Sequence, residues 1–143
     1  MLFFFNQLFY IELTLFIKKE LKIMAIVLFE PETTDLTEYE MKLVPIMVNC
    51  LKSKIGKENA VKNSYMVEKM REHGHDVNEI RIRKIISYIR RKGLVACLMA
   101  SNKGYYITED KNEMWNYTQS LLGREEAIHE VRMAMENQLE KMK

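Results

Sequence analysis

One amphipathic segment near the middle of the chain constrains the fold more than any other feature. Four isoleucines recur in it with the i, i+3, i+4, i+7 spacing of a helix that is buried along one face. They are Ile82, Ile85, Ile86 and Ile89. Asp76 and Glu79 resemble a capping box at its start, and Gly93 is its expected end. Because Arg and Lys take most of the other positions, this helix should carry a cationic outer surface.

A longer helix is expected upstream, between Glu38 and Ile55. Apolar residues recur there every three or four positions and predict one buried face. They are Met41, Val44, Val48, Leu51 and Ile55. Asp35 or Thr37 is the expected cap and Gly56 the expected end. Pro45 lies inside the pattern, so a kink there and a helix that begins near Pro45 are both compatible with the sequence.

A short helix should connect these two segments. It is expected from Ser64 to His73, with Asn63 or Ser64 as its cap and a turn at Gly74. Its apolar stripe consists of Tyr65, Met66, Val67 and Met70.

The chain changes character after Gly93, where strand-forming residues replace the helical pattern. Residues 94–99 and 105–108 predict two strands, and the polar residues 101–104 between them predict a turn. Together they form a β-hairpin with Lys103 at its tip. Since side chains alternate along a strand, one of Tyr105 and Tyr106 should face the core and the other the surface.

The tail, residues 109–143, is predicted to be one long helix capped by Thr108 or Asp110. Met114, Leu121, Ile128, Met135 and Met142 recur in it every seven residues. We expect the preceding domain to cover the first part of this stripe, around Met114, Trp115 and Tyr117. Beyond Gly123 the stripe needs another partner, and a second copy of the chain is the simplest one. The predicted dimerisation residues are Leu121, Ile128, Val131, Met135 and Leu139. The alternative is a monomer whose tail folds back onto the first helix.

Charge is concentrated in the middle of the sequence. Residues 62–103 hold ten Lys/Arg and four Asp/Glu, which gives 10 − 4 = +6, whereas residues 1–61 give 7 − 8 = −1 and residues 104–143 give 5 − 8 = −3. A basic segment between acidic ends indicates a surface that meets an anion.

The order helix, short helix, glycine turn, basic helix and hairpin is that of a winged helix-turn-helix, in which the third helix enters the DNA major groove. The fold class is therefore mainly α with a small β-hairpin, a winged helix-turn-helix over residues 37–108 followed by a C-terminal helix over 109–143. With the isoleucines turned inward, five residues of the third helix should point outward and Arg83 should flank the stripe. Including the hairpin tip, the predicted DNA-binding residues are Arg81, Arg83, Lys84, Ser87, Tyr88, Arg91 and Lys103.

The stretch EIRIRKIISYIRRKGLVACLMASNKGYYIT, residues 79–108, resembles a winged helix-turn-helix family of bacteriophages and prophages. The likeness lies in the IRxxIxxLRxxG-like helix and in a hairpin ending in SxKGYY, and more widely it covers Thr37 to Leu139. It implies binding of double-stranded DNA in phage replication or gene control, without catalysis, and other replication or regulatory proteins as further partners. The alternative is a winged-helix adaptor that contacts proteins and does not bind DNA.

No pattern in the sequence predicts an enzyme, a cofactor or a metal site. His73 and His75 have no further His or Cys nearby with ligand spacing. Cys50 and Cys97 form no Cys-x-x-Cys motif and are expected to be small core residues of a cytoplasmic protein.

The first 23 residues differ from the rest of the chain. Met1–Ile17 is strongly apolar but is shorter than a bilayer span and contains Asn6, Gln7 and Glu12. Lys19 and Glu20 can be encoded as AAGGAG, a ribosome-binding sequence just upstream of the Met24 codon. We expect translation to start at Met24, followed by an arm over residues 24–36. A membrane anchor over residues 1–17 and an ordinary amphipathic arm are the alternatives, and without such an anchor no membrane contact is expected.

Overall fold

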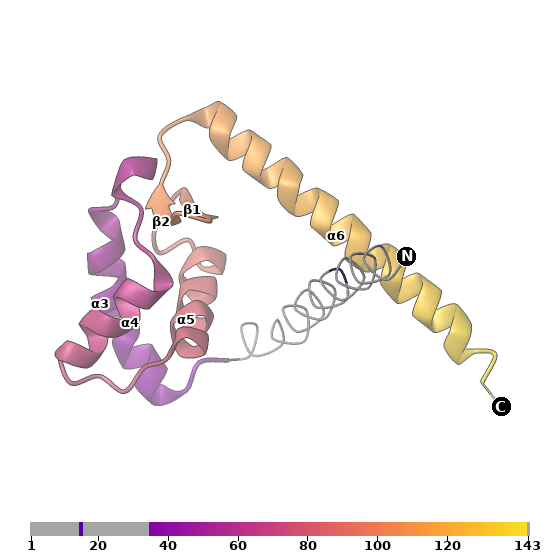
Figure 1. Ribbon diagram of the computed structural model, residues 1–143, viewed down its shortest axis with the longest axis horizontal. Coiled ribbons are helices and arrows are strands. Elements are labelled where there is room, and N and C mark those ends of the chain that lie inside the picture. Colours follow the sequence, from indigo (N-terminus) through magenta and orange to yellow (C-terminus); the bar gives the residue numbers. More distant parts are fainter. Residues whose placement is uncertain (1–14, 16–34, 143) are drawn as a thin grey trace, which may run out of the picture. The chain divides into compact units, whose positions relative to one another are not determined.

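The computed structural model describes Leu15 and residues 35–142, so the predictions for residues 1–23 and for most of the arm lie outside the described residues. The described part is mainly helical, with one two-stranded hairpin and a long C-terminal helix (Figure 1). Its elements are α3 (Glu38–Lys52), η1 (Lys57–Asn59), α4 (Asn63–Glu72), α5 (Glu79–Arg91), β1 (Leu98–Ser101), β2 (Gly104–Ile107) and α6 (Lys111–Leu139).

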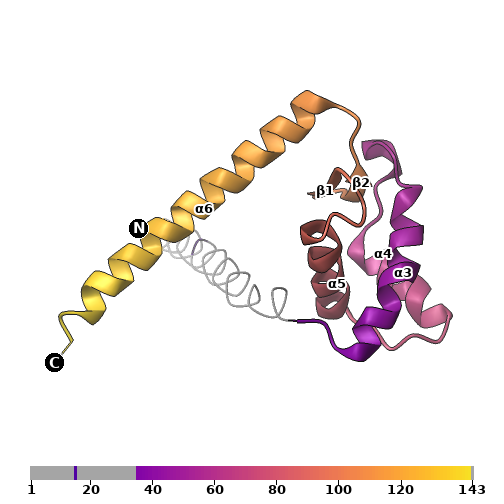
Figure 2. The ribbon, with the colours of Figure 1, turned by 180° about the vertical axis from the view of Figure 1, so that it is seen from behind.

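These elements belong to two compact units. The first contains α3 up to Met47 together with residues 63–93, which include α4 and α5 (Figure 2). The second contains residues 48–62 and the chain from Leu94 onward, which includes the hairpin and α6.

A reciprocal capping box starts α3. The Thr37 hydroxyl accepts a hydrogen bond from the Glu40 backbone N–H (3.2 Å), and Glu40 Oε2 accepts one from the Thr37 backbone N–H (2.9 Å). Thr37 is therefore the cap, one of the two expected. The helix passes through Pro45 without a break and ends at Lys52, three residues before the expected end at Ile55.

The buried face of α3 differs from the predicted one. The residues that face the core are Glu40, Leu43, Val44, Met47 and Leu51. Met41 and Ile55, which were expected on this face, are exposed, and Val48 is only half-buried. Val44 and Leu51 are buried as predicted, but the predicted face is rotated by about a sixth of a turn from the observed one, because a face built on Met41 leaves out Leu43 and Met47.

The short helix α4 buries Met66, Val67 and Met70, as expected, whereas Tyr65 is exposed. It ends in a Schellman motif. The Gly74 N–H bonds to the Arg71 carbonyl (2.9 Å) and the His75 N–H to the Met70 carbonyl (3.0 Å). This motif needs a left-handed residue, and Gly74 supplies it with φ 82.

The basic helix α5 buries the predicted four isoleucines, each of them at most 2% exposed. Its cap is Asn78, whose side chain accepts a hydrogen bond from the Arg81 N–H (2.8 Å). The prediction of Asp76 as the cap was wrong, because the Asp76 carboxylate instead contacts the Arg81 side chain.

The hairpin has a two-residue turn, Asn102-Lys103, and pairs Leu98 with Ile107 and Ser101 with Gly104. The first strand begins at Leu98, four residues later than predicted, because residues 94–97 form bends and turns. As expected, one tyrosine faces the core: Tyr106 is 3% exposed, whereas Tyr105 is half-buried.

A contact that the sequence did not indicate supports the outer edge of β2. Val61 and Tyr105 exchange two backbone hydrogen bonds (2.9 and 2.8 Å), and Ile55 forms a further bridge to Ile107. At Gly104, with φ 118, an added Cβ would lie 2.3 Å from the Val61 carbonyl oxygen. Only glycine lets the two backbones come this close.

The long helix α6 has 29 residues and is capped by Asp110, whose side chain accepts from the Asn112 N–H (2.8 Å). The Glu113 carboxylate in its first turn receives hydrogen bonds from the hydroxyls of Thr108 (2.6 Å) and Tyr106. No residue of α6 is buried, and Trp115 is 62% exposed. The expectation that the preceding domain covers the first part of this helix was therefore wrong for Trp115, whereas Met114 and Tyr117 are half-buried.

The two cysteines are also not core residues. Cys50 and Cys97 are both exposed. Cys50 lies one position off the buried face of α3, and Cys97 lies in the turn before β1 with φ 56 instead of inside a strand.

Candidate nucleic-acid interface

The residues predicted to contact DNA lie in two places, six on α5 and Lys103 in the hairpin turn. The four buried isoleucines fix which side of α5 faces inward, so the remaining positions form its outer surface. Four of the six residues are held in internal contacts, and those contacts decide what each can offer a ligand.

Lys84 was predicted to point outward into solvent, but this prediction was wrong, because Lys84 pairs with Glu40 of α3. Its Nζ lies 2.8 Å from Glu40 Oε2, and the two side chains are 12% and 6% exposed. The pair joins residues 44 positions apart. Lys84 therefore ties α5 to α3, and its charge is largely neutralised within the protein.

Arg81 is held by three groups. Its Nε lies 3.4 Å from Glu40 Oε1, and its Nη1 lies 3.3 Å from Asp76 Oδ2 and donates to the Asp76 carbonyl. Its guanidinium also lies 5.4 Å from the centre of the Tyr39 ring, an arrangement that favours a cation–π contact. The Tyr39 hydroxyl in turn accepts a hydrogen bond from the Asp76 N–H (2.8 Å). Arg81 keeps 29% of its side chain exposed in a fixed orientation.

Glu40 is the centre of this cluster and was not identified from the sequence. Burial alone would raise its pKa, but the hydrogen bonds from Lys84 and from the Thr37 backbone, together with the charges of Lys84 and Arg81, hold the pKa below its usual value. Glu40 is thus ionised at neutral pH and balances part of the charge of α5. The capping-box spacing of Thr37 and Glu40 was the only local signal for it.

The other predicted residues of α5 are more accessible. Arg83 pairs with Glu79 one turn earlier (2.9 Å), and its side chain is 35% exposed. Ser87 and Tyr88 are half-buried, and Lys92 lies 6.0 Å from the centre of the Tyr88 ring. Arg91 is exposed, and no carboxylate in the described part of the chain pairs with it. The cationic surface that remains free for a ligand is therefore at the C-terminal half of α5.

In the second unit, the hairpin turn presents Lys103. Its backbone N–H donates to the Ser101 hydroxyl (3.1 Å), which itself donates to the Gly104 carbonyl (3.1 Å). These contacts fix the turn, and the Lys103 side chain is left exposed at its tip.

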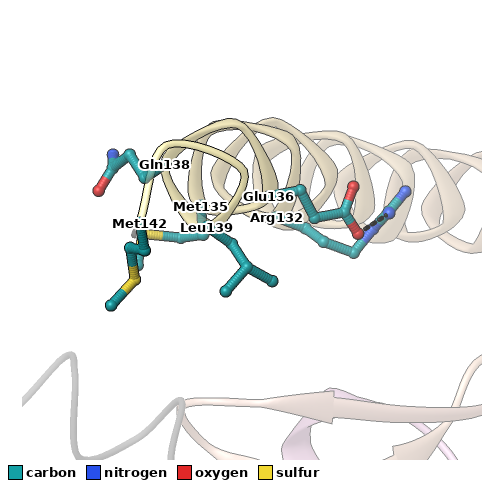
Figure 3. A pocket seen from close by; sticks show the side chains of 6 residues that line it. All are labelled: Arg132, Met135, Glu136, Gln138, Leu139 and Met142. Atoms are coloured by element: carbon teal, nitrogen blue, oxygen red, sulfur yellow. Dashed lines mark hydrogen bonds and ion pairs between the residues drawn. The ribbon is translucent and has the colours of Figure 1, made fainter.

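All five predicted dimerisation residues are exposed on α6. Their exposed fractions run from 41% for Leu121 to 66% for Leu139. Near the end of the helix, Met135, Leu139 and Met142 line an open depression together with the Arg132–Glu136 ion pair (Figure 3).

Leu15 and residues 35–142 contain no group of three His, Cys, Asp or Glu side chains placed to hold a metal ion. Over the same residues, no helix combines the length and the apolar character that crossing a bilayer requires.

Comparison with known proteins gives no relative, since neither a family model, nor a curated protein, nor a solved structure matches this chain. The assignment of function consequently depends on the residues of the chain and on their arrangement.

Proposed function

We propose that this protein binds double-stranded DNA through the outer face of α5, as a winged helix-turn-helix protein. The observation that carries this proposal is the composition of α5. A helix of 13 residues buries four isoleucines on one side and presents Arg83, Arg91 and the clamped Arg81 on the other. Guanidinium groups suit both phosphate oxygens and the guanine edge, because their donors form a planar fork.

The internal contacts of α5 support different roles for its two ends, with anchoring near the start and ligand contact near the end. Arg81 and Lys84 near its start are balanced by Glu40 and fix the helix in the first unit. Arg91 near its end is exposed and free to approach a phosphate. Ser87 and Tyr88 lie between them, where half-buried side chains can still meet base edges or sugars. We assign Lys103 a backbone contact from the hairpin.

The length of the connection between α4 and α5 differs from that of a typical helix-turn-helix motif. It runs from His73 to Asn78, six residues, whereas the helix-turn-helix turn commonly has three or four. Val77, which is 1% exposed, anchors the end of this connection that precedes α5, and Arg71 Nε donates to its carbonyl (2.8 Å). The longer turn is thus fixed by its own contacts, which is compatible with a rigid presentation of α5.

The resemblance of residues 79–108 to phage and prophage proteins suggests a role in replication or gene control of a phage or mobile element. A second candidate is a protein-interaction adaptor without DNA binding. The neutralisation of Lys84 by Glu40 favours this candidate, because it removes one cation from the proposed DNA surface.

Fluorescence anisotropy with a labelled duplex of random sequence tests the proposal. The full-length protein should bind at 50 mM salt and lose affinity steeply as salt rises, because bound phosphates release counterions. The double variant Arg83→Ala/Arg91→Ala should reduce the slope of log K against log salt by about two, and Lys103→Ala by about one.

The matched control is Arg124→Ala/Lys141→Ala, which removes the same charge from α6 and from the turn that follows it, and should leave the slope unchanged. Folded protein that gives no anisotropy change at 50 mM salt would exclude DNA binding and leave the adaptor. Equal effects of the two double variants would show that net charge, not α5, carries the binding.

A further inference from the structure

Ile80 is the one isoleucine of α5 whose side chain lies on the outer face of the helix. It is 42% exposed, whereas the other four isoleucines of α5 are at most 2% exposed. A rotation of 100° per residue places Ile80 about 170° from the middle of the face that those four isoleucines form. Arg91, in the last turn of the same helix, lies at about the same angle. Ile80 and Arg91 are therefore the outermost residues at the two ends of α5.

The half of α5 that contains Ile80 carries cations that are balanced by carboxylates of the same unit. The pairs are Arg81 with Asp76 and Glu40, Arg83 with Glu79, and Lys84 with Glu40. Three cations thus face three carboxylates. Arg91 at the other end is exposed, and no carboxylate in the described part of the chain pairs with it. The outer face of α5 is consequently neutral with an apolar tip at its start and cationic at its end.

These two ends suit different parts of a DNA duplex. Phosphates line the rims of the major groove and attract the cations of a protein. The base edges on the floor of the groove present hydrogen-bond donors and acceptors and, at each thymine, a C5-methyl group. In helix-turn-helix proteins, the N-terminal residues of the recognition helix contact these base edges. A neutral helix start with an apolar tip therefore fits the floor of the groove at a thymine, and Arg91 fits the rim.

The backbone around Ile80 is fixed by contacts on both of its sides. The Asn78 side chain accepts a hydrogen bond from the Arg81 N–H (2.8 Å), and the Asn63 amide donates to the Glu79 carbonyl (3.1 Å). The side chain of isoleucine is itself stiff, because a β-branched residue in a helix has one strongly preferred χ1 rotamer. Ile80 is thus presented in one direction, which a contact with a single methyl group requires because such a contact contributes little free energy.

We propose that Ile80 is a specificity-determining residue that contacts the C5-methyl group of a thymine in the major groove. The inference rests on the proposed binding of DNA by α5, and it adds a base contact at the end of the helix that the ion pairs anchor.

Replacement of thymine by uracil in a selected duplex tests this contact. The full-length protein is first used to select from a pool of random-sequence duplexes, and the most enriched duplex serves as the probe. Each of its thymines is then replaced in turn by uracil, which pairs in the same way and lacks only the methyl group. At one position, the replacement should weaken binding about fourfold, the effect of removing one methyl group from an apolar contact.

The variant Ile80→Ala should bind the thymine and uracil forms of this probe equally, because the side chain that senses the methyl group is gone. Its slope of log K against log salt should equal that of the parent, since no phosphate contact is lost. Ile46→Ala is the matched control, because Ile46 of α3 is similarly exposed, at 40%. This control should retain the fourfold preference for thymine.

The outcomes distinguish this inference from the proposed function. Folded protein that binds no duplex would overturn both, and the exposed Ile80 would then suit a protein partner. Binding of DNA without enrichment of any sequence, or without an effect of uracil at any position, would overturn only the role of Ile80. A preference for thymine that Ile80→Ala retains would assign the methyl contact to another residue, and it would overturn the inference while leaving DNA binding intact.

Discussion

The helices α5 and α6 carry apolar residues at similar spacing, yet these residues are buried in α5 and exposed in α6. Ile82, Ile85, Ile86 and Ile89 of α5 are all but inaccessible, whereas Ile128 and Val131 of α6 are 56% and 63% exposed. The charges follow the same division. The carboxylate opposite α5 is Glu40, 6% exposed and shared by two cations, while the ion pair of α6, Arg132–Glu136, is half exposed at both ends. An apolar stripe thus indicates that one face of a helix packs against something, but it does not indicate whether that surface belongs to the same chain or to another molecule.

The largest expected effect comes from shortening one isoleucine on each helix. Ile85→Ala should reduce the free energy of unfolding by about 3 kcal/mol, because the deletion leaves a cavity in a packed core. Ile128→Ala should change it by less than about 0.5 kcal/mol at protein concentrations where the chain is monomeric. Urea unfolding followed by circular dichroism measures both. A cost for Ile128→Ala as large as that for Ile85→Ala would mean that the chain itself covers α6.

The two carboxylates allow a second comparison. Glu40→Ala should cost about 2 kcal/mol, since it leaves the Lys84 ammonium, 12% exposed, without its partner. Glu136→Ala should cost no more than about 0.5 kcal/mol, because its pair with Arg132 is solvated. The same unfolding assay applies. If Glu40→Ala were neutral, the cluster around Glu40 would not be what holds α5 to α3.

Replacing each of two glycines by alanine should change the stability of the protein in opposite directions. Gly104→Ala should destabilise the protein by about 2 kcal/mol, because of its positive φ and the Val61 carbonyl at 2.3 Å from the new Cβ. Gly123→Ala should stabilise it by about 0.5–1 kcal/mol, because Gly123 is helical and has open space around it. Thermal unfolding of the two variants beside the parent gives the comparison. Destabilisation by Gly123→Ala would point to a close helix contact at that position.

The smallest effects concern pH. The hydrogen bonds from Thr108 and Tyr106 lower the pKa of Glu113 against the effect of burial, and the Glu40 pKa is also lowered. Since the folded-state pKa values lie below the unfolded ones, this stabilisation is present above about pH 4.5 and is lost as the pH falls through the folded-state values. Glu113→Gln should therefore flatten the acid limb of a stability–pH profile. An unchanged limb would argue against the contact.

Tyr106 gives the corresponding test in base. Its hydrogen bond to Glu113, together with burial and the Glu113 charge, raises the Tyr106 pKa to about 12. Stability from this group is complete below about pH 10 and declines as the pH rises toward 12. In an absorbance titration of tyrosinate, Tyr106→Phe should remove the component that titrates last. Loss of an earlier component instead would show that Tyr106 ionises normally.

Local patterns predicted the elements better than the contacts between them. The isoleucine face of α5, the β-hairpin and the long tail helix are present as expected, because each is encoded within a few neighbouring residues, although the hairpin turn has two residues instead of the predicted four. The predicted buried face of α3 differs from the observed one, because the apolar residues around Pro45 fit two overlapping helical periodicities.

The missed features depend on residues far apart in the sequence. Nothing near Glu40 indicates that Lys84 will neutralise it, so five positions of α5 were predicted to point outward although Lys84 is tied to α3. The bridge between Val61 and Tyr105 is likewise invisible to a local pattern. Thr37 and Glu40 show the contrast, because their capping box has a short-range signature and one of its members was identified.

The attachment of Glu113 to Tyr106 and Thr108 has a consequence for how the length of α6 can vary. This attachment sets the rotational phase of the helix with respect to the hairpin, and each residue added after it turns everything downstream by about 100°. A one-residue insertion near Asn116 would swing Ile128 and Met135 to a different side, whereas four residues would shift them by about 40° and seven by about 20° in the opposite sense. Changes of chain length in this helix are therefore compatible with the same outward direction of its side chains only when they come close to whole turns.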